Sequence, residues 1–302
     1  MGRVSARNLG LLALGVAAVS VSSILIRLAE DAPPLVIAFY RNAFAAALLL
    51  PFALTRRRAE LRALTRRQWG ACAASGAFLA AHFALWIPSL SFTTVAASTV
   101  LVTTQPIWVG AAGHWWLGER LTRAAVVGIA VALAGAVVVS GSDFGLSDRG
   151  LLGDLLALGG AWAAAGYFLI GRRVRQGLSL VTYAAIVYST CAALLAVVVA
   201  VSGQPFLGHA PNVWLLFLLM ALVPQILGHT VFNFLLGDVE AAVIAIAVMG
   251  EPVGATVLAL VILGESPPLA TVLGGALILA GVYLAIAAQA RRRAAPIPVP
   301  VE

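Results

Sequence analysis

The sequence predicts an all-α integral membrane protein, with ten transmembrane helices arranged as two inverted repeats of five helices. Of the 302 residues, 62% are apolar and only 10% are charged, whereas soluble proteins carry about 25% charged residues. The apolar residues fall into long runs with few charges, and a bilayer-spanning helix needs about 20 such residues. Short motifs also return 146 residues apart, which indicates an internal duplication.

Charges, prolines and polar clusters separate the ten apolar spans. The first span follows Arg3 and Arg7 and has no convincing small-residue cleavage site, so it is predicted to be a helix rather than a signal peptide. In order, the spans cover residues 8–28, 34–54, 70–90, 94–116, 123–140, 151–171, 180–202, 212–236, 240–263 and 269–289. The proline-rich segment 291–302 is predicted to be a free tail.

The distribution of arginine predicts the orientation in the membrane. All 19 basic residues are arginine, and the net charge is +7. Alternate loops and termini on one side hold sixteen of them: Arg3, Arg7, Arg56, Arg57, Arg58, Arg62, Arg66, Arg67, Arg120, Arg123, Arg172, Arg173, Arg175, Arg291, Arg292 and Arg293. The other side holds only Arg149. Because arginine-rich loops stay in the cytoplasm, both termini are predicted to be cytoplasmic, and the positive charge needs no nucleic acid to explain it.

The duplication divides the chain into a first repeat, 1–145, and a second repeat, 146–290. Its matching pairs are Pro106 with Pro252, Gly118-Glu119 with Gly264-Glu265, Gly128 with Gly274, and Ala134-Gly135 with Ala280-Gly281. Since each repeat holds five spans, the second repeat must enter the membrane from the opposite side. Inverted repeats are typical of secondary transporters, whose substrate site lies near the bilayer midplane.

These motifs resemble the EamA-type members of the drug/metabolite transporter superfamily, including the YddG-like amino acid exporters. The segments that carry the resemblance are Phe83-Ala84-Leu85-Trp86 through Gln105-Pro106 to Gly118-Glu119, and Gly228-His229-Thr230 through Gly250-Glu251-Pro252 to Gly264-Glu265. The resemblance implies that spans one, three, four, six, eight and nine line a central cavity. It implies that spans five and ten are peripheral.

Span three places polar side chains on one helical face. Ser75, His82, Trp86 and Ser89 are separated by seven, four and three residues, a spacing that brings side chains to one side of a helix. We predict that His82 and Trp86 line the cavity, because intramembrane ionisable residues usually face the interior. The alternative is that His82 bonds a neighbouring helix and Trp86 fills packing space.

Span four carries Thr103 and Gln105 directly before Pro106, whose ring removes a backbone hydrogen bond and tends to kink a helix. We predict that both polar side chains face the cavity, since an amide has few partners in lipid. For Thr99 and Thr104 we favour hydrogen bonds to their own helix instead.

Spans six and eight supply further candidates for the cavity. Trp162 lies about 16 Å into span six at 1.5 Å per residue, deeper than an interfacial tryptophan, and it matches an aromatic cavity position of the YddG-like exporters. We therefore rank it first among the candidates. In span eight, Gln225, His229 and Asn233 follow at intervals of four and form a second polar stripe.

Span nine contains Glu251 near mid-membrane, where a charge costs on the order of 2.5 to 3.5 kcal/mol. Its counterpart in the first repeat is the neutral Gln105. Two interpretations are equally favoured for Glu251. It either couples protons or binds a substrate ammonium, or it bonds the kinked backbone at Pro252.

Two arginines fall inside or at the edge of spans. Arg27 either attracts a substrate carboxylate at the outer mouth or extends to the lipid headgroups. Arg41 lies two turns into span two, which the resemblance places outside the cavity. We therefore predict that it pairs with Glu30 or Asp31.

The predicted function is a secondary transporter of a bacterial inner membrane that exports amino acids or similar small metabolites by alternating access. Carriers of a nucleoside, a sugar derivative or an organic cation are alternatives, and a membrane-embedded enzyme is a weaker one. The absence of lysine excludes a Walker lysine, and the isolated Cys72 and Cys191 indicate no metal or disulfide. No cofactor is expected, and a homodimer remains open.

Overall fold

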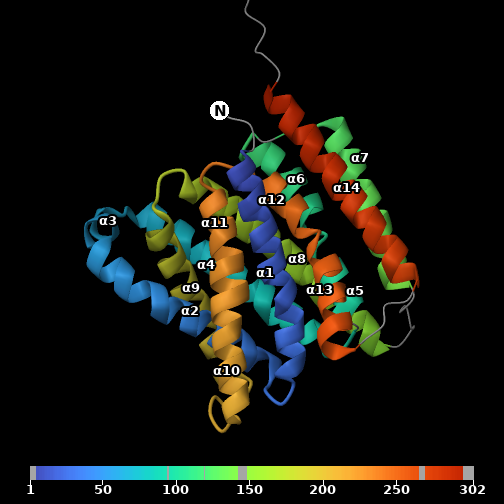
Figure 1. The fold of residues 1–302 in the computed structure, drawn as a ribbon. Helices are drawn as coiled ribbons and strands as arrows, with labels where there is room; N and C mark the ends of the chain where they lie inside the picture. Colours follow the sequence, from blue (N-terminus) through green and yellow to red (C-terminus); the bar gives the residue numbers. More distant parts are fainter. Residues whose placement is uncertain (1–4, 94, 119, 142–147, 265–268, 295–302) are drawn as a thin grey trace, which may run out of the picture.

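The computed structural model describes residues 5–93, 95–118, 120–141, 148–264 and 269–294. Within these ranges every regular element is helical (Figure 1). The first half contains α1 (Ala6–Leu28), α2 (Pro34–Arg56), α3 (Arg58–Ala63), α4 (Arg66–Ser89), α5 (Val95–Val102), α6 (Gln105–Trp116) and α7 (Arg123–Gly141). The second half contains α8 (Asp148–Arg175), α9 (Leu180–Val201), α10 (Pro211–Met220), the π-helical η1 (Ala221–Thr230), α11 (Val231–Leu235), α12 (Ala241–Val248), α13 (Glu251–Leu258), the π-helical η2 (Ala259–Leu263) and α14 (Leu269–Ala294).

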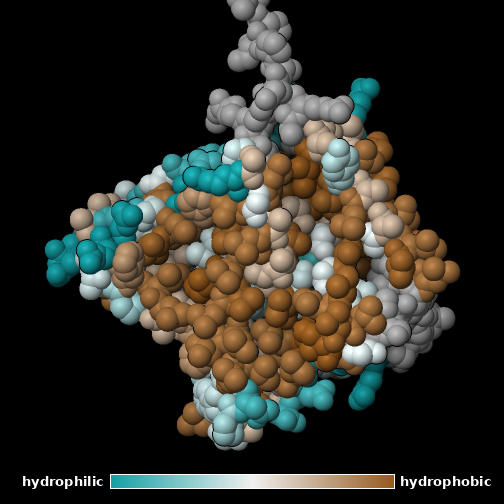
Figure 2. Space-filling model, viewed as in Figure 1, coloured by the Kyte–Doolittle hydropathy of each residue, from teal (hydrophilic) through white to brown (hydrophobic). Residues whose placement is uncertain are grey.

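The surface and the helix lengths identify a multi-pass membrane protein. Seven helical segments among the described residues are long and apolar enough to cross a membrane, and α7 and α14 contribute the shorter apolar stretches Arg123–Val138 and Val272–Ala288. Apolar side chains cover the broad middle of the face in Figure 2, and hydrophilic residues gather toward its two ends. Such an apolar belt belongs in lipid. Ten spans would require three further segments to cross the membrane: α5 together with α6, α7, and α14. The number ten therefore stays a prediction.

Local sequence signals explain where several helices begin. The Ser5 and Ser179 hydroxyls accept hydrogen bonds from the backbones of Asn8 and Thr182, and thus cap α1 and α9. Thr65 forms a reciprocal capping box with Gln68 at the start of α4. Proline stands at the first positions of α2 and α10, where its missing N–H group is not needed.

Predicted spans four and nine are interrupted rather than merely kinked. The first breaks at Thr103-Thr104 between α5 and α6, and the second breaks at Met249-Gly250 between α12 and α13. In each case proline is the second residue of the following helix, and its ring prevents a continuous helix. Gly118 and Gly264, which follow these broken segments, both have left-handed backbones, with φ of +68° and +70°. Glu119 and Glu265 of the predicted Gly-Glu turns lie outside the described residues.

The remaining helices enclose the two breaks. α4 packs against α8 and α9, while α1 packs against η1 and α13. α7 and α14 form a separate pair along one side of the molecule (Figure 1), as the resemblance implies for spans five and ten. α1 begins and α14 ends at the same end of the bundle (Figure 1).

Glycines allow α7 and α14 to touch backbone to backbone. A Cβ atom added at Gly128 would lie 2.6 Å from the carbonyl oxygen of Gly281, and one at Gly135 would lie 2.5 Å from that of Gly274. Small residues permit such approaches in lipid, where close packing holds helices together. The glycines that recur in the two repeats therefore form a packing face between α7 and α14.

The short helix α3 is fixed to the start of α9 by one carboxylate. Glu60 accepts hydrogen bonds from the Ser179 backbone at 2.7 Å, the Ser179 hydroxyl at 2.5 Å and the Thr182 hydroxyl at 2.6 Å. Partial burial raises the pKa of Glu60, but the hydrogen bonds outweigh this effect, and its pKa lies below the ordinary value of 4.5. Because the carboxylate also lies at a helix N-terminus, its charge suits this position.

Glu60→Ala should therefore lower the thermal stability of the purified protein by several degrees at neutral pH. A carboxylate whose pKa is lower in the folded state stabilises the fold above its unfolded pKa. This contribution is lost as the pH falls through the folded pKa. The difference in melting temperature from wild type should thus be full at about pH 7 and should shrink below about pH 4.5. Exposed Glu30, substituted by alanine, is the control. A difference that is independent of pH would contradict the role of the Glu60 charge.

Candidate functional site

A cavity lies at the two helix breaks, enclosed by side chains from both halves of the chain. Its lining consists of Val19, His82, Trp86, Val102, Thr103, Gln105, Ala164, Tyr167, Phe168, His229, Phe232, Val248 and Glu251. These residues come from the predicted spans one, three, four, six, eight and nine, which are the spans that the resemblance implies. The cavity has a volume of about 30 Å³, which is room for about one water molecule.

Two stacked rings from α4 form one wall of the cavity. The His82 and Trp86 rings lie 5.7 Å apart with an interplanar angle of 14°, and the His82 Nδ1 atom lies 3.0 Å from the Gly160 carbonyl oxygen. Trp86 is buried, and among the described residues its Nε1 has no hydrogen-bond partner. The same holds for Nδ1 of His229, whose ring lies 6.2 Å from His82. Two residues that line the cavity thus carry buried ring nitrogens without a hydrogen-bond partner in the described part of the chain.

The helix breaks place Thr103, Gln105 and Glu251 on the lining. Gln105 and Glu251 are the first residues of α6 and α13, respectively. Thr103 also donates a hydrogen bond to the Val100 carbonyl oxygen at 2.9 Å. Thr99 and Thr104 hydrogen-bond to their own helix at 2.7 Å, and this confirms the interpretation favoured for these two residues. Ser20 of α1 donates to the Glu251 carbonyl oxygen at 3.3 Å, and thus fixes α1 beside the second break.

Gln225 and Asn233 lie one layer behind the cavity. Asn233 accepts a hydrogen bond from the Tyr167 hydroxyl at 2.6 Å and donates one to the Tyr188 hydroxyl at 3.2 Å. Both side chains are fully buried, and neither lines the cavity. The predicted stripe assumed a regular α-helix, but η1 is π-helical. Its wider turn changes the angle between Gln225 and His229, which are four residues apart, while Asn233 belongs to the following helix α11. Only His229 of the three lines the cavity.

Trp162 does not line the cavity. It is 56% exposed and packs against Phe78, with ring centroids 5.5 Å apart. Trp162 precedes Ala164, which does line the cavity, by two residues, or about 200° around an α-helix. The expectation that ranked Trp162 first is therefore corrected. Tyr167, three residues after Ala164, occupies the aromatic cavity position of α8.

Arg41 is a buried cation in the core, and its predicted pairing with Glu30 or Asp31 is wrong. It is fully buried, whereas Glu30 and Asp31 are exposed. Arg41 donates hydrogen bonds of 2.7 Å to Gln225 Oε1 and Ser22 Oγ, and its guanidinium lies 4.3 Å from the centre of the Phe83 ring. Its remaining nitrogen, NH2, has no partner among the described residues. Glu251, like Arg41, is buried. Arg27, in contrast, is exposed.

Sequence reasoning missed Tyr167, Phe168 and the buried position of Arg41. The signal for the aromatic pair was available, because Gly160, Ala164 and Tyr167 follow a helical spacing that leads from the His82 contact into the cavity. Arg41 gave no such signal, since Ser22 and Gln225 belong to other helices.

Membrane-length helices around a polar cavity at two broken helices define the class of helical membrane transporters. The chain belongs to the EamA-like transporter family, which matches residues 8–141 and 151–287. It is 26% identical over 269 residues to an uncharacterized transporter of Archaeoglobus fulgidus, covering 86% of this chain and 90% of the relative. A second uncharacterized transporter, from Clostridium kluyveri, is 26% identical over 243 residues and covers 78% of each chain.

A solved crystal structure shares the fold. It superposes with a TM-score of 0.78 at 20% identity, and the match covers 94% of this chain and 98% of the other. These similarities identify a transporter of the drug/metabolite superfamily.

Proposed function

We propose that this transporter exports amino acids or similar small metabolites by alternating access between two inverted halves, 1–145 and 146–290. The observation that carries the proposal is the placement of one carboxylate, Glu251, and one amide, Gln105, at matching helix breaks on the two sides of one cavity. Helix breaks of this kind form the substrate sites of many secondary transporters.

The chemistry of the lining favours a small zwitterion. Glu251 supplies a negative charge for an ammonium group, while the N-terminus of α6 at Gln105 supplies a positive pole for a carboxylate. His82, Trp86 and Tyr167 supply aromatic surface for an apolar side chain. A phosphorylated substrate fits less well, because no arginine lines the cavity among the described residues, and the buried Arg41 is engaged with Phe83, Gln225 and Ser22.

The small volume of the cavity indicates that it must widen to admit a substrate. About 30 Å³ is far less than an amino acid needs. We propose that the two halves rock about the breaks and open the cavity to one side at a time. The common end of α1 and α14 and the sixteen arginines support cytoplasmic termini, which we propose for a bacterial inner membrane.

Flux into proteoliposomes tests the proposal, with a mixed pool of amino acids, nucleosides, sugar derivatives and organic cations detected by mass spectrometry. We expect neutral amino acids to accumulate. Trp86→Ala and His82→Ala should lower this flux at least about tenfold, which corresponds to about 1.4 kcal/mol, and should leave the folded yield intact. Trp162→Ala is the matched comparison, since it removes a tryptophan from the outer face of α8.

The outcomes separate the substrate from the site. If another solute class is transported and its flux depends on Trp86, the amino acid assignment is contradicted but the assignment of the cavity as the substrate site stands. Loss of flux in Trp162→Ala alone would contradict the cavity assignment.

A further inference from the structure

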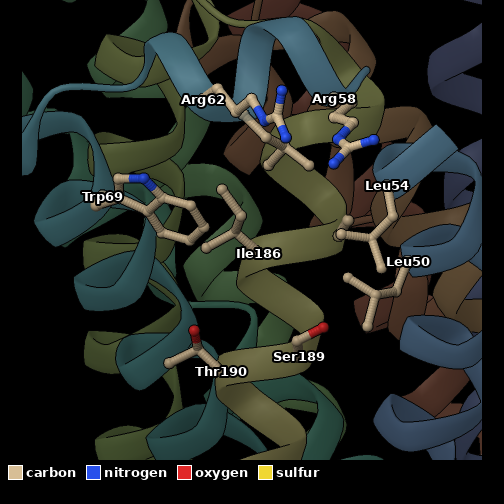
Figure 3. Close-up of a pocket in the computed structure, with 10 residues that line it drawn as sticks. Leu50, Leu54, Arg58, Arg62, Trp69, Ile186, Ser189 and Thr190 are labelled. Atoms are coloured by element: carbon tan, nitrogen blue, oxygen red, sulfur yellow. The ribbon is translucent and has the colours of Figure 1, made fainter. Parts of the chain in front are cut away.

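A second pocket opens on the lipid-facing side of the bundle, away from the central cavity. It has a volume of about 440 Å³ and lies between α2, α3, α4 and α9. Leu50 and Leu54 of α2, Trp69 of α4 and Ile186 of α9 form much of its apolar wall (Figure 3). Leu54 and Trp69 are 54% and 44% exposed, so the pocket is accessible from the surrounding membrane.

Two arginines lie at one end of this lateral pocket. Figure 3 shows the guanidinium groups of Arg58 and Arg62 together above Leu54 and Ile186, with Ser189 and Thr190 at the opposite end. Arg58 and Arg62 are four residues apart on α3, and side chains at this spacing share a helical face. Both are exposed, and neither has a hydrogen-bond partner in the described part of the chain. Two positive charges thus cap an apolar pocket.

The position of these arginines is fixed by the fold. Between them in sequence lies Glu60, whose carboxylate is engaged by Ser179 and Thr182 of the α9 start. This contact holds α3 against α9. The Glu60 carboxylate is bound by Ser179 and Thr182 and does not pair with either arginine. Arg58 and Arg62 therefore remain available to an anion, at a depth marked by Trp69, since tryptophan is enriched at the membrane interface.

We propose that the lateral pocket is a binding site for an anionic phospholipid. The phosphate would accept hydrogen bonds from Arg58 and Arg62, whose planar guanidinium groups suit phosphate oxygens. One acyl chain would lie along Leu50, Leu54 and Ile186. Charge complementarity selects an anionic headgroup, because a zwitterionic lipid brings its own cation next to two arginines. Basic pockets between transmembrane helices bind anionic headgroups in this way.

Native mass spectrometry of the delipidated full-length protein tests this site. The probes are phosphatidylglycerol and phosphatidylcholine with identical acyl chains, dihexanoyl phosphatidylglycerol, and inorganic phosphate. Wild type should bind long-chain phosphatidylglycerol at least about tenfold more tightly than phosphatidylcholine, because each basic group near the headgroups contributes about fivefold. The short-chain lipid should bind more weakly, and inorganic phosphate should not compete.

The variant Arg58→Gln/Arg62→Gln should lose this preference. The control Arg66→Gln/Arg67→Gln removes the same charge from exposed positions at the start of α4, outside the pocket, and should keep it. Equal binding of both lipids by wild type, or an equal loss in both double variants, would overturn the proposal. If inorganic phosphate competes with the lipid and the acyl chain length has no effect on binding, the pocket is a site for free phosphate, and the proposed lipid site is overturned.

Discussion

Gly281→Leu should nearly abolish the yield of folded protein. A Cβ atom at this position would lie 2.5 Å from the Ala132 backbone nitrogen and 2.8 Å from the Ala132 Cβ, and it would also meet the Gly128 carbonyl oxygen. All of these atoms belong to the rigid α7 helix, so the two helices would have to separate. In lipid, loss of close packing is not replaced by a hydrophobic driving force between helices. We expect at least about a tenfold loss of monodisperse protein, equivalent to about 1.4 kcal/mol or more.

Gel filtration of a fluorescent fusion after mild solubilisation measures this yield. Gly10→Leu is the matched control, because a Cβ at Gly10 of α1 meets no atom within 4 Å. Gly128→Leu, on the facing helix, should behave like Gly281→Leu. If Gly281→Leu were purified as well as Gly10→Leu and lost only transport, the α7–α14 contact would not be a packing face.

Regular helical spacing predicted which residues line the cavity where the helix is regular. His82 and Trp86 lie one turn apart on α4, which is α-helical from Arg66 to Ser89, and both reach the cavity as expected. The same argument failed for Gln225 in η1, where the helix is π-helical, and for Asn233 in the short helix α11 that follows it, since neither side chain lines the cavity. The π-helical stretch contains Pro224, and the polar pattern alone does not encode it.

Depth in the membrane was a weaker guide than angle around the helix. Trp162 lies deep in its span but points outward, and Tyr167 on the same helix lines the cavity. Depth along a helix does not fix the direction in which a side chain points around the helix axis. The depth argument therefore could not decide between them.

Arg41 illustrates what sequence cannot supply. Its three contacts come from α1, α4 and η1, and they meet only after the helices have packed. The two prolines, in contrast, predicted disturbed helices at 103–106 and 249–252, and the structure places breaks there. The inverted relation of the two halves is still a proposal that these matched breaks support.

Glu251→Gln is the substitution that we expect to affect transport most. The change keeps the size of the side chain and makes the second break resemble the first, where Gln105 precedes Pro106. It removes the negative charge proposed to bind the substrate ammonium. Amino acid flux should fall at least about tenfold, which is equivalent to about 1.4 kcal/mol. This loss is smaller than the free energy of roughly 2.5 to 3.5 kcal/mol that it costs to place a charge at mid-membrane. Glu30→Gln, on an exposed turn, is the control.

A stability measurement distinguishes the two roles that Glu251 can have, because Glu251 and the oppositely charged Arg41 are both buried. If Glu251 serves the substrate, Glu251→Gln should keep its folded yield and melting temperature and lose flux. If Glu251 mainly balances Arg41, both yield and flux should fall together, since an uncompensated buried cation destabilises the fold. Flux should be followed from about pH 5.5 to 8, because a proton-coupling role of Glu251 would make the flux depend on pH. Parental flux across this range would remove Glu251 from the site and leave it as a structural residue of the helix break.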